Sequence, residues 1–149
     1  SIIEIGRFCV DPKYSHPAII MLAWKTVQKL IETHSVSFLF GCSSFNGTQF
    51  DKYEDTFALL KNNYLAPKKF LPKQKAPDVI NFNDVLQYRK VNLKKARKTL
   101  PPLLNSYLIL GGWVSDHAVI DKEMNTLHVF TGLQVENIPQ NRLKFISNH

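Results

Sequence analysis

The sequence predicts an α/β protein with a mixed central sheet and flanking helices, and two patterns carry this prediction. An apolar stretch at 2–10, a helical pattern at 17–31 and a second apolar stretch at 36–42 follow one another along the chain. Two strands joined by a helical crossover lie parallel in one sheet. Two further stretches, 113–121 and 126–135, flank a short polar turn and predict an antiparallel hairpin. The sheet therefore has both parallel and antiparallel neighbours.

The first predicted strand, 2–10, carries Glu4 and Arg7 in an otherwise apolar run. Such runs are typical of strands that are covered on both faces, where an unpaired charge is costly. Residues three apart on a strand point to opposite faces, so Glu4 and Arg7 serve different surroundings unless a bulge re-aims one of them. The roles left open here are a structural ion pair, a rim position and a functional site.

An apolar strand without a neighbour exposes unpaired N–H and C=O groups and is prone to aggregation. We therefore expect strand 2–10 to be paired on both sides. One neighbour is the strand at 36–42. The other comes from another fragment, another copy, or residues outside the 149 of this chain.

The first and second helices of the chain follow from similar patterns. Pro17 suits the first position of the helix at 17–31, and a second amphipathic helix is predicted at 51–64. The three prolines of 66–78 indicate a loop. The apolar residues that face the core from the first helix are Ile19, Ile20, Ala23, Val27, Leu30 and Ile31.

A third helix begins at Asn83 or Asp84 and runs towards Lys98. The Pro-Pro pair after it interrupts the helical backbone and starts a fresh helix up to Leu110, where a Gly-Gly pair ends it.

The composition indicates one domain, because 149 residues with 44% hydrophobic residues suffice for a core. The sequence has no apolar run of the roughly eighteen residues that a membrane span needs and no secretory signal pattern, so we expect a cytoplasmic protein. Cys9 and Cys42 lie in apolar contexts without metal-ligand spacing, which predicts buried free thiols and no metal site. A nucleophilic cysteine is the weaker alternative, because no histidine is obviously paired with either.

Four segments in order resemble the ornithine N-acyltransferases, a family often labelled hemolysin-like and related to the acyl-homoserine-lactone synthases. Glu4-Ile5-Gly6-Arg7-Phe8-Cys9-Val10 is similar to their Glu-Ile-Gly-Arg-x-Cys-Val, and residues 38–45 to their Tyr/Phe-x-Phe-Gly-Cys-Ala-Ser. Residues 100–113 resemble Leu-Pro-Pro-Leu-Leu-x-x-Tyr-Leu-x-Leu-Gly-Ala, which the lactone synthases lack. Residues 118–130 continue with Ala-Val-Ile-Asp and Val-Phe.

This resemblance implies a GNAT-like acyltransferase fold, with residues 1–149 forming a single domain. A GNAT domain normally brings three strands and one or two helices before the strand that matches 2–10, so we expect this chain to be the C-terminal part of the fold. A native start after methionine removal is the alternative. His117 stands where the family often has Pro, and His128 where it often has Asp.

The activity implied is transfer of a 3-hydroxyacyl group from acyl carrier protein to the α-amine of ornithine, a step in ornithine-lipid biosynthesis. The acyl-phosphopantetheine arm is the donor, and no permanently bound cofactor is expected. Glu4 would organise or deprotonate the amine. Arg7 would hold the acceptor carboxylate, Glu4 or the phosphopantetheine. Backbone N–H groups near Cys9 and Val10 would contact the oxyanion.

Other polar residues have more open roles. Lys13 and Ser15 would hold the phosphate of the donor, and Ser43 and Ser44 are either pantetheine ligands or plain strand-end residues. Tyr107 is a candidate acid for the leaving thiol, although a core position is favoured. His117, Asp121 and His128 are taken as structural.

The loop at 13–18 favours a donor with one phosphodiester over coenzyme A. GNAT enzymes cradle the coenzyme A diphosphate on a glycine-containing loop at this place, where backbone N–H groups face the anion. Here the loop has no glycine, and Pro17 has no N–H to donate.

Positive charge is concentrated between Lys61 and Lys98, where eleven basic residues stand against two acidic ones. Such a field steers an acidic partner, and acyl carrier proteins are strongly acidic. Anionic lipid head groups are a rival partner and imply peripheral contact with the inner membrane. A simply solvated face is another alternative, and no nucleic-acid signature accompanies the basic residues. The predicted docking residues are Lys90, Lys94, Lys95, Arg97 and Lys98.

Two alternative functions remain at this point. One is a synthase of the acyl-homoserine-lactone type, against which residues 100–113 argue. The other is a non-catalytic fragment that only docks carrier protein or membrane.

Overall fold

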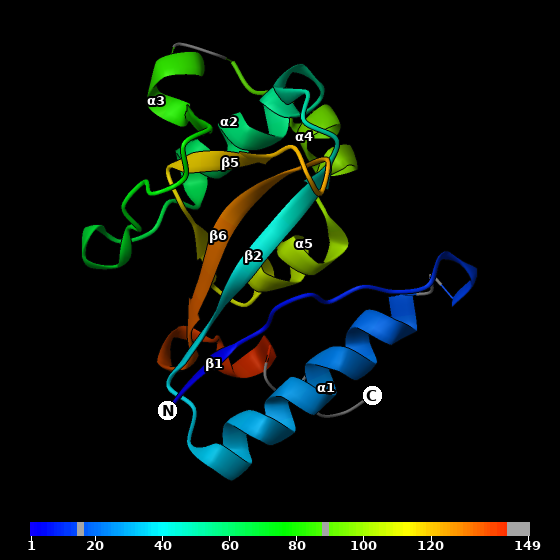
Figure 1. Ribbon diagram of the computed structural model, residues 1–149. Coiled ribbons are helices and arrows are strands. Elements are labelled where there is room, and N and C mark those ends of the chain that lie inside the picture. The colour runs from blue at the N-terminus through cyan, green and yellow to red at the C-terminus, as the bar shows by residue number, and fades with distance from the viewer. Residues whose placement is uncertain (15–16, 88–89, 143–149) are drawn as a thin grey trace.

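The computed structural model describes residues 1–14, 17–87 and 90–142, and Figure 1 shows their arrangement. Within these residues a six-stranded mixed sheet is flanked by helices, which confirms the α/β class and is consistent with a GNAT-like fold. The strands are β1 (Ile2–Glu4), β2 (Phe38–Asn46), β3 (Val79–Asn81), β4 (Trp113–Val114), β5 (His117–Asp121) and β6 (Thr126–Gln134). The α-helices are α1 (Pro17–His34), α2 (Glu54–Asn63), α3 (Phe82–Val85), α4 (Leu93–Thr99) and α5 (Pro102–Ile109). The short 3-10 helices are η1 (Pro12–Tyr14), η2 (Phe50–Tyr53), η3 (Lys68–Phe70) and η4 (Val135–Asn137).

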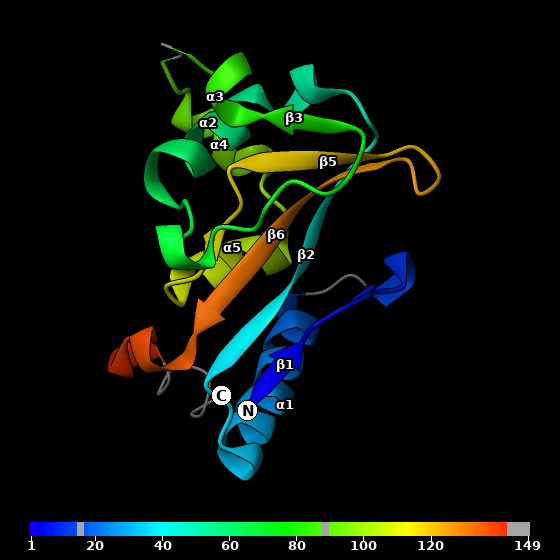
Figure 2. The same ribbon diagram turned by 60° about the vertical axis from the view of Figure 1, so that its left-hand side comes forward.

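The strand order β1-β2-β6-β5-β3 confirms both predicted motifs, and β4 pairs with β6 beside this path. β1 and β2 are parallel neighbours joined by α1, which is the predicted βαβ unit. β5 and β6 are antiparallel and meet in the predicted hairpin, where Asn125 has φ +51° and the Met124 N–H donates to Asp121 Oδ1 over 2.9 Å. β1 lies at one edge of the sheet, as Figure 2 shows.

Helical side chains pack on one face of the sheet. Alternate residues of β2 and β6, such as Leu39 and Leu133, point to this face and are fully buried. Trp24 of α1 and Tyr107 of α5 join them near β1, while Phe57 of α2 lies in a second apolar cluster nearer β5. The sheet thus rests on a helical layer that includes α1, α2 and α5.

The other face of the sheet carries a group of aromatic side chains. Phe38, Phe40 and Phe130 point to this face, and their rings contact each other or those of Phe70 and Trp113 at centroid distances of 5.5 to 6.3 Å. We call these five residues the aromatic face. No helix within the described residues is long and apolar enough to cross a membrane.

The first strand departs from its prediction in length and burial. Regular pairing ends at Glu4, and Ile2 is 65% and Phe8 38% exposed rather than buried. The physical reason is that β1 has a neighbour on one side: β2 pairs with it, whereas no other described strand borders its second edge. The second neighbour that we expected is therefore not supplied by the described residues.

The region before α5 was also predicted incorrectly. The single helix expected towards Lys98 is divided into α3 and α4, each beginning with an asparagine cap. The Asn81 side chain accepts the Asn83 N–H over 3.0 Å, and the Asn92 side chain accepts the Lys95 N–H over 3.1 Å. β3 directly precedes α3, and its pairing with β5 could not be read from three residues.

The helix at 17–31 is confirmed, but its buried stripe centres on a residue outside the predicted set. Trp24 is 6% exposed, whereas Leu30 is 39% exposed. The strand expected at 113–121 is divided into β4 and β5, because the chain turns at Ser115, whose hydroxyl donates to the His117 carbonyl over 2.7 Å.

Gly41 holds the chain after β1 against β2, and replacing it should loosen this contact. A Cβ at Gly41 would lie 2.3 Å from the carbonyl oxygen of Ile5, whose N–H donates to the Phe40 carbonyl over 2.7 Å. We expect Gly41→Ala to lower the free energy of unfolding by about 1–3 kcal/mol, the usual cost of overpacking, in urea denaturation.

Gly6→Ala is the matched control, because its Cβ would make an ordinary contact of 3.4 Å with Glu4. Equal stabilities of the Gly41→Ala and Gly6→Ala proteins would show that Gly41 is not needed for this approach.

Candidate active site

A cleft of about 540 Å³ opens where β1 and β2 separate, and its volume is in the range of small-molecule sites. Pairing between the two strands ends after Ile5 and Phe40, whereas β2 continues to Asn46. The walls come from the N-terminal segment, β2, the start of α5 and two single residues. They are 4–8, Val10, 42–44, 101–104, Ile20 and Met124.

The separating strands present backbone groups to the cleft. Among the described residues, the N–H groups of 6–10 donate no backbone hydrogen bond. On the β1 side, β2 pairs with no other strand of the described part of the chain beyond Phe40. Such edges bind ligands that carry amides, because an extended ligand can pair with them as a strand does.

Glu4 is the last residue of β1 and lines the cleft. Strand alternation directs its neighbours Ile3 and Ile5 into the core, so Glu4 points to the opposite face, on which Phe40 and Cys42 also lie. Burial, followed by the negative charge of Glu4, raises the pKa of the Cys42 thiol. The carboxylate and this thiol are therefore electrostatic neighbours.

Arg7 lies in the left-handed region of backbone space, with φ +52°. This conformation costs a residue with a Cβ roughly 1–2 kcal/mol, and such outliers gather at functional sites. The turn brings Arg7 to the same cleft as Glu4. In a regular strand the two side chains would have pointed to opposite faces, and the interruption at Arg7 removes this constraint. These two described residues form no ion pair with each other, so the structural ion pair left open above is not formed.

The two serines of β2 differ in their surroundings. Ser43 is 7% exposed, and its hydroxyl lies 2.9 Å from that of Thr131. The Ser43 hydroxyl is thus hydrogen-bonded to a neighbouring strand, although the residue also contributes to the cleft wall. Ser44 points to the opposite face, is exposed and lines the cleft, so its hydroxyl is accessible to a ligand.

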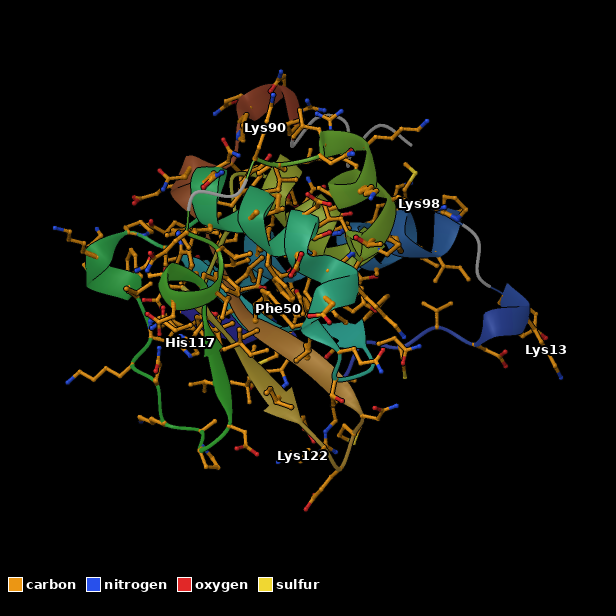
Figure 3. All side chains as sticks on the ribbon, turned by 90° about the horizontal axis from the view of Figure 1, so that it is seen from above. Lys13, Phe50, Lys90, Lys98, His117 and Lys122 are labelled. Atoms are coloured by element: carbon orange, nitrogen blue, oxygen red, sulfur yellow. The ribbon has the colours of Figure 1, made fainter. Side chains whose placement is uncertain are left out.

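Of the other residues predicted to bind the donor, only some lie at the cleft. Val10 lines it, but Cys9 and Lys13 do not. Lys13 belongs to η1, where its N–H donates to Asp11 Oδ1 over 2.9 Å, and its side chain projects at the periphery in Figure 3. Ser15 lies outside the described residues.

Both cysteines are exposed as residues, which corrects the expectation of two buried thiols, although neighbouring atoms still shield the Cys42 thiol in part from water. For Cys9 the reason is the departure of the chain from the sheet after Glu4, and for Cys42 it is the position on the face opposite the helical layer of α1, α2 and α5. The raised pKa of Cys42 disfavours its thiolate, which argues further against a nucleophilic role.

Four of the five predicted docking residues lie on α4. α4 is held by Ala96, which is fully buried and whose carbonyl accepts a hydrogen bond of 2.9 Å from Thr56. Its lysines and arginine are exposed and pair with no acid among the described residues. Two residues after α4 ends, Pro101 lines the cleft. We call Lys90, Lys94, Lys95, Arg97 and Lys98 the basic surface; Figure 3 labels Lys90 and Lys98.

Several parts of the cleft wall were not predicted as site residues, among them Ile5, Gly6, Phe8 and Cys42 of the motif segments. Residues 101–104 come from the Leu-Pro-Pro-Leu-Leu segment, which served only as a family marker although its early helix start places it at the cleft. Ile20 and Met124 are single apolar residues on α1 and in the hairpin turn, and no signal in the sequence distinguishes them.

The residues taken as structural do not line the cleft. His117 is 5% exposed, and its Nδ1 lies 2.7 Å from Asp116 Oδ1. Tyr107 is a core residue, and its burial raises the pKa of its hydroxyl, so it is no ready proton donor. Burial lowers the pKa of His128 against an opposing effect of Asp121. Within the described chain, no three His, Cys, Asp or Glu residues are grouped as metal ligands.

Curated relatives match nearly the whole chain. This chain is 30% identical to an L-ornithine N(alpha)-acyltransferase of Brucella abortus over 144 residues. The matched stretch covers 97% of this chain and 51% of the relative. A protein of the same name from Rhodobacter capsulatus is 26% identical over 144 residues, 97% of this chain and 54% of the relative. The chain thus spans about half the length of these relatives. No protein-family model and no solved structure matches it.

The proximity of Glu4 to Cys42 can be measured through the reactivity of the thiol. Removing the negative charge of Glu4 should lower the pKa of Cys42, although burial keeps it above its ordinary value. In a Cys9→Ser background, we therefore expect Glu4→Gln to shift the pH profile of Cys42 alkylation to lower pH.

Glu32→Gln is the control, because Glu32 lies on α1 and bonds to Gln28. Unchanged alkylation profiles in both variants would contradict the placement of Glu4 beside the thiol.

Proposed function

Since this chain belongs to the family of the L-ornithine N(alpha)-acyltransferases, we propose that it transfers an acyl group to the α-amine of ornithine. The donor proposed is a 3-hydroxyacyl thioester on acyl carrier protein, and the product a precursor of ornithine lipid. The observation that carries the proposal is the convergence of Glu4, Arg7 and Ser44 with 101–104 in one cleft beside the basic surface.

The cleft offers the groups that this reaction requires. The attacking amine must lose a proton, and Glu4 is the carboxylate that lines the cleft and can accept it. The neutral amine attacks the thioester carbonyl, and the tetrahedral intermediate then releases the pantetheine thiol. Arg7 can bind the carboxylate of the amino acid through two parallel N–H···O bonds.

Backbone groups supply the other contacts. The N–H groups of 6–10, which donate no backbone bond within the described chain, can stabilise the oxyanion where they face the cleft. The same edge and that of β2 can pair with the two amides of the pantetheine arm. Ser44 adds a hydroxyl at the end of this path.

The basic surface supports carrier protein as the source of the acyl group. An acidic partner that docks on α4 stands next to 101–104, from which its prosthetic arm can enter the cleft. We place the reaction in the cytoplasm, with anionic lipid as a second ligand of the basic surface at the inner membrane. The names of the relatives favour this activity over a lactone synthase, and a non-catalytic docking role would leave the Arg7 strain without a purpose.

Glu4→Gln separates catalysis from support of the fold. Glutamine keeps the shape of the side chain but cannot accept the proton. We therefore expect a folded protein whose kcat is reduced at least about 100-fold, the usual effect of a general base. Acylation of ornithine is followed by mass spectrometry. A folded variant with nearly normal turnover would make Glu4 a structural acid.

Carrier-bound and coenzyme A-bound acyl donors should be used unequally. We expect at least a roughly tenfold higher kcat/KM for the carrier-bound donor, a difference of about 1.4 kcal/mol. Reversing the charges of Lys94, Lys95 and Lys98 should raise KM for the carrier with little change in kcat, and added salt should act likewise.

The matched control reverses Lys25 and Lys29 on α1, outside the basic surface. Equal use of both donors, or an equal effect of the two sets of reversals, would contradict docking on α4.

A further inference from the structure

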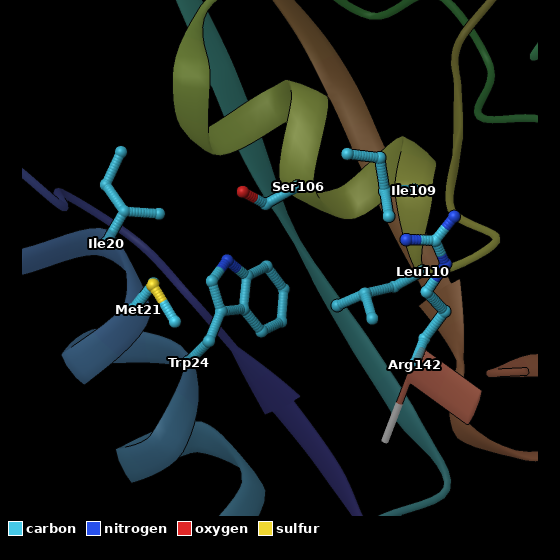
Figure 4. Close-up of a pocket in the computed structure, with 7 residues that line it drawn as sticks. All are labelled: Ile20, Met21, Trp24, Ser106, Ile109, Leu110 and Arg142. Atoms are coloured by element: carbon cyan, nitrogen blue, oxygen red, sulfur yellow. The ribbon is translucent and has the colours of Figure 1, made fainter. Parts of the chain in front are cut away.

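We propose that a second cavity, between α1 and α5, binds an alkyl chain that carries a hydroxyl or carbonyl oxygen, and that the Trp24 indole N–H donates a hydrogen bond to this oxygen. The cavity measures about 300 Å³ and is distinct from the cleft of Glu4 and Arg7, although Ile20 lines both. Figure 4 shows Trp24 of α1 and Ser106 of α5 on its two sides.

The lining of the cavity suits an apolar chain. Ile20 and Met21 come from α1, and Ile109 and Leu110 from the end of α5, so four aliphatic side chains surround the indole ring. An apolar cavity of about 150 Å³ already binds benzene, and this one is twice as large. Such a site gains affinity from the apolar surface that a chain removes from water.

Trp24 gives the cavity a directed polar group. The residue is 6% exposed, and among the described residues its Nε1 has no hydrogen-bond partner. In Figure 4 this nitrogen points towards the space between Ile20 and Ser106. The Ser106 hydroxyl is engaged with the Pro102 carbonyl over 3.1 Å. A buried N–H without a partner costs free energy, and an oxygen on a bound chain would remove this cost.

Tyr107 packs against the Trp24 ring without lining the cavity itself. Its ring stands edge-on to that of Trp24 with centroids 5.0 Å apart. Its hydroxyl is buried and likewise unpartnered within the described chain. Two neighbouring rings thus keep one polar atom each without a partner in an otherwise apolar cluster, which is unusual because buried polar groups are nearly always hydrogen-bonded.

The shared residue Ile20 indicates where the chain comes from. A chain whose thioester lies in the cleft passes Ile20 and reaches the cavity between the same two helices. The occupant is therefore the donor acyl chain, with the hydroxyl of its third carbon at Trp24, a step that rests on the proposed function. A free fatty acid is the other source of the same chemistry, and the exposed Arg142 could hold its carboxylate.

Binding can be measured without catalysis. The protein labelled with ¹⁵N at tryptophan has two indole N–H signals, from Trp24 and Trp113, which a Trp113→Phe variant assigns. We titrate it with decanoate, 3-hydroxydecanoate and 1-decanol. The two hydroxylated chains should move the Trp24 signal downfield, leave Trp113 unmoved, and bind several-fold more tightly than decanoate. No shift of the Trp24 signal in the folded protein with any of the three would overturn the proposal.

Three substitutions locate the ligand. Met21→Trp should fill the cavity and weaken the hydroxylated chains at least tenfold, whereas Leu22→Trp, at a 64% exposed neighbour on the same helix, should not. Trp24→Phe keeps the ring but removes the N–H, so its affinities for 1-decanol and decane-1-thiol should become equal. Equal weakening by Met21→Trp and Leu22→Trp, or an undiminished preference for the alcohol in Trp24→Phe, would place the ligand elsewhere.

The source of the chain follows from a comparison of donors. In the Met21→Trp protein, KM should rise for a ten-carbon acyl donor but not for a four-carbon donor, if the acyl chain reaches the cavity from the cleft. An unchanged KM for both, together with loss of decanoate binding in Arg142→Gln, would overturn the acyl-chain assignment in favour of a free acid. If no transfer occurs at all, the proposed function fails, and the titrations above still decide whether the cavity binds alkyl chains.

Discussion

The close approach of the Ile5 carbonyl to the backbone of Gly41 determines where the first strand separates from the sheet. Up to this point β1 and β2 form a parallel ladder, and the Ile5 N–H makes the last bond to Phe40. Beyond it, the left-handed turn at Arg7 directs the chain away, and β2 continues alone on that side. The cleft exists because two strands that begin as neighbours end apart. A side chain at residue 41 would push against the Ile5 backbone itself.

The groups around this separation suit a long amphipathic substrate. The unpaired strand edges accept amides, Glu4 and Arg7 supply opposite charges without neutralising each other, and α4 presents positive charge close to 101–104. Ile20 also lines the mainly apolar cavity between α1 and α5. Under the proposed function, each region would meet one part of an acyl-pantetheine thioester on an acidic protein: the partner surface, the amide-bearing arm, the reacting carbonyl and the chain.

Local patterns predicted the βαβ unit, the hairpin and α5, because each depends on apolar periodicity or on Pro and Gly within a few residues. The motif residues Glu4, Arg7, Val10 and Ser44 were predicted as well, and they lie in one cleft. The burial of 2–10 was not predictable, because an apolar strand is buried only if neighbours cover both its edges and faces. Trp24 was missed because helical periodicity identifies a stripe but not the residue at its centre. The contribution of 101–104 depends on contacts with residues nearly a hundred positions away, which no local pattern contains.

We propose that the reacting carbonyl lies between Glu4 and Ser44, where β1 and β2 separate. A crystal structure of the protein with a decanoyl-pantetheine analogue, in which a methylene replaces the thioester sulfur, tests this claim most directly. We expect the carbonyl next to Glu4, the pantetheine amides along 6–10 and the β2 edge, and the chain beyond Ile20. An analogue bound on the aromatic face, or in a cleft formed without Glu4 and 101–104, would contradict it.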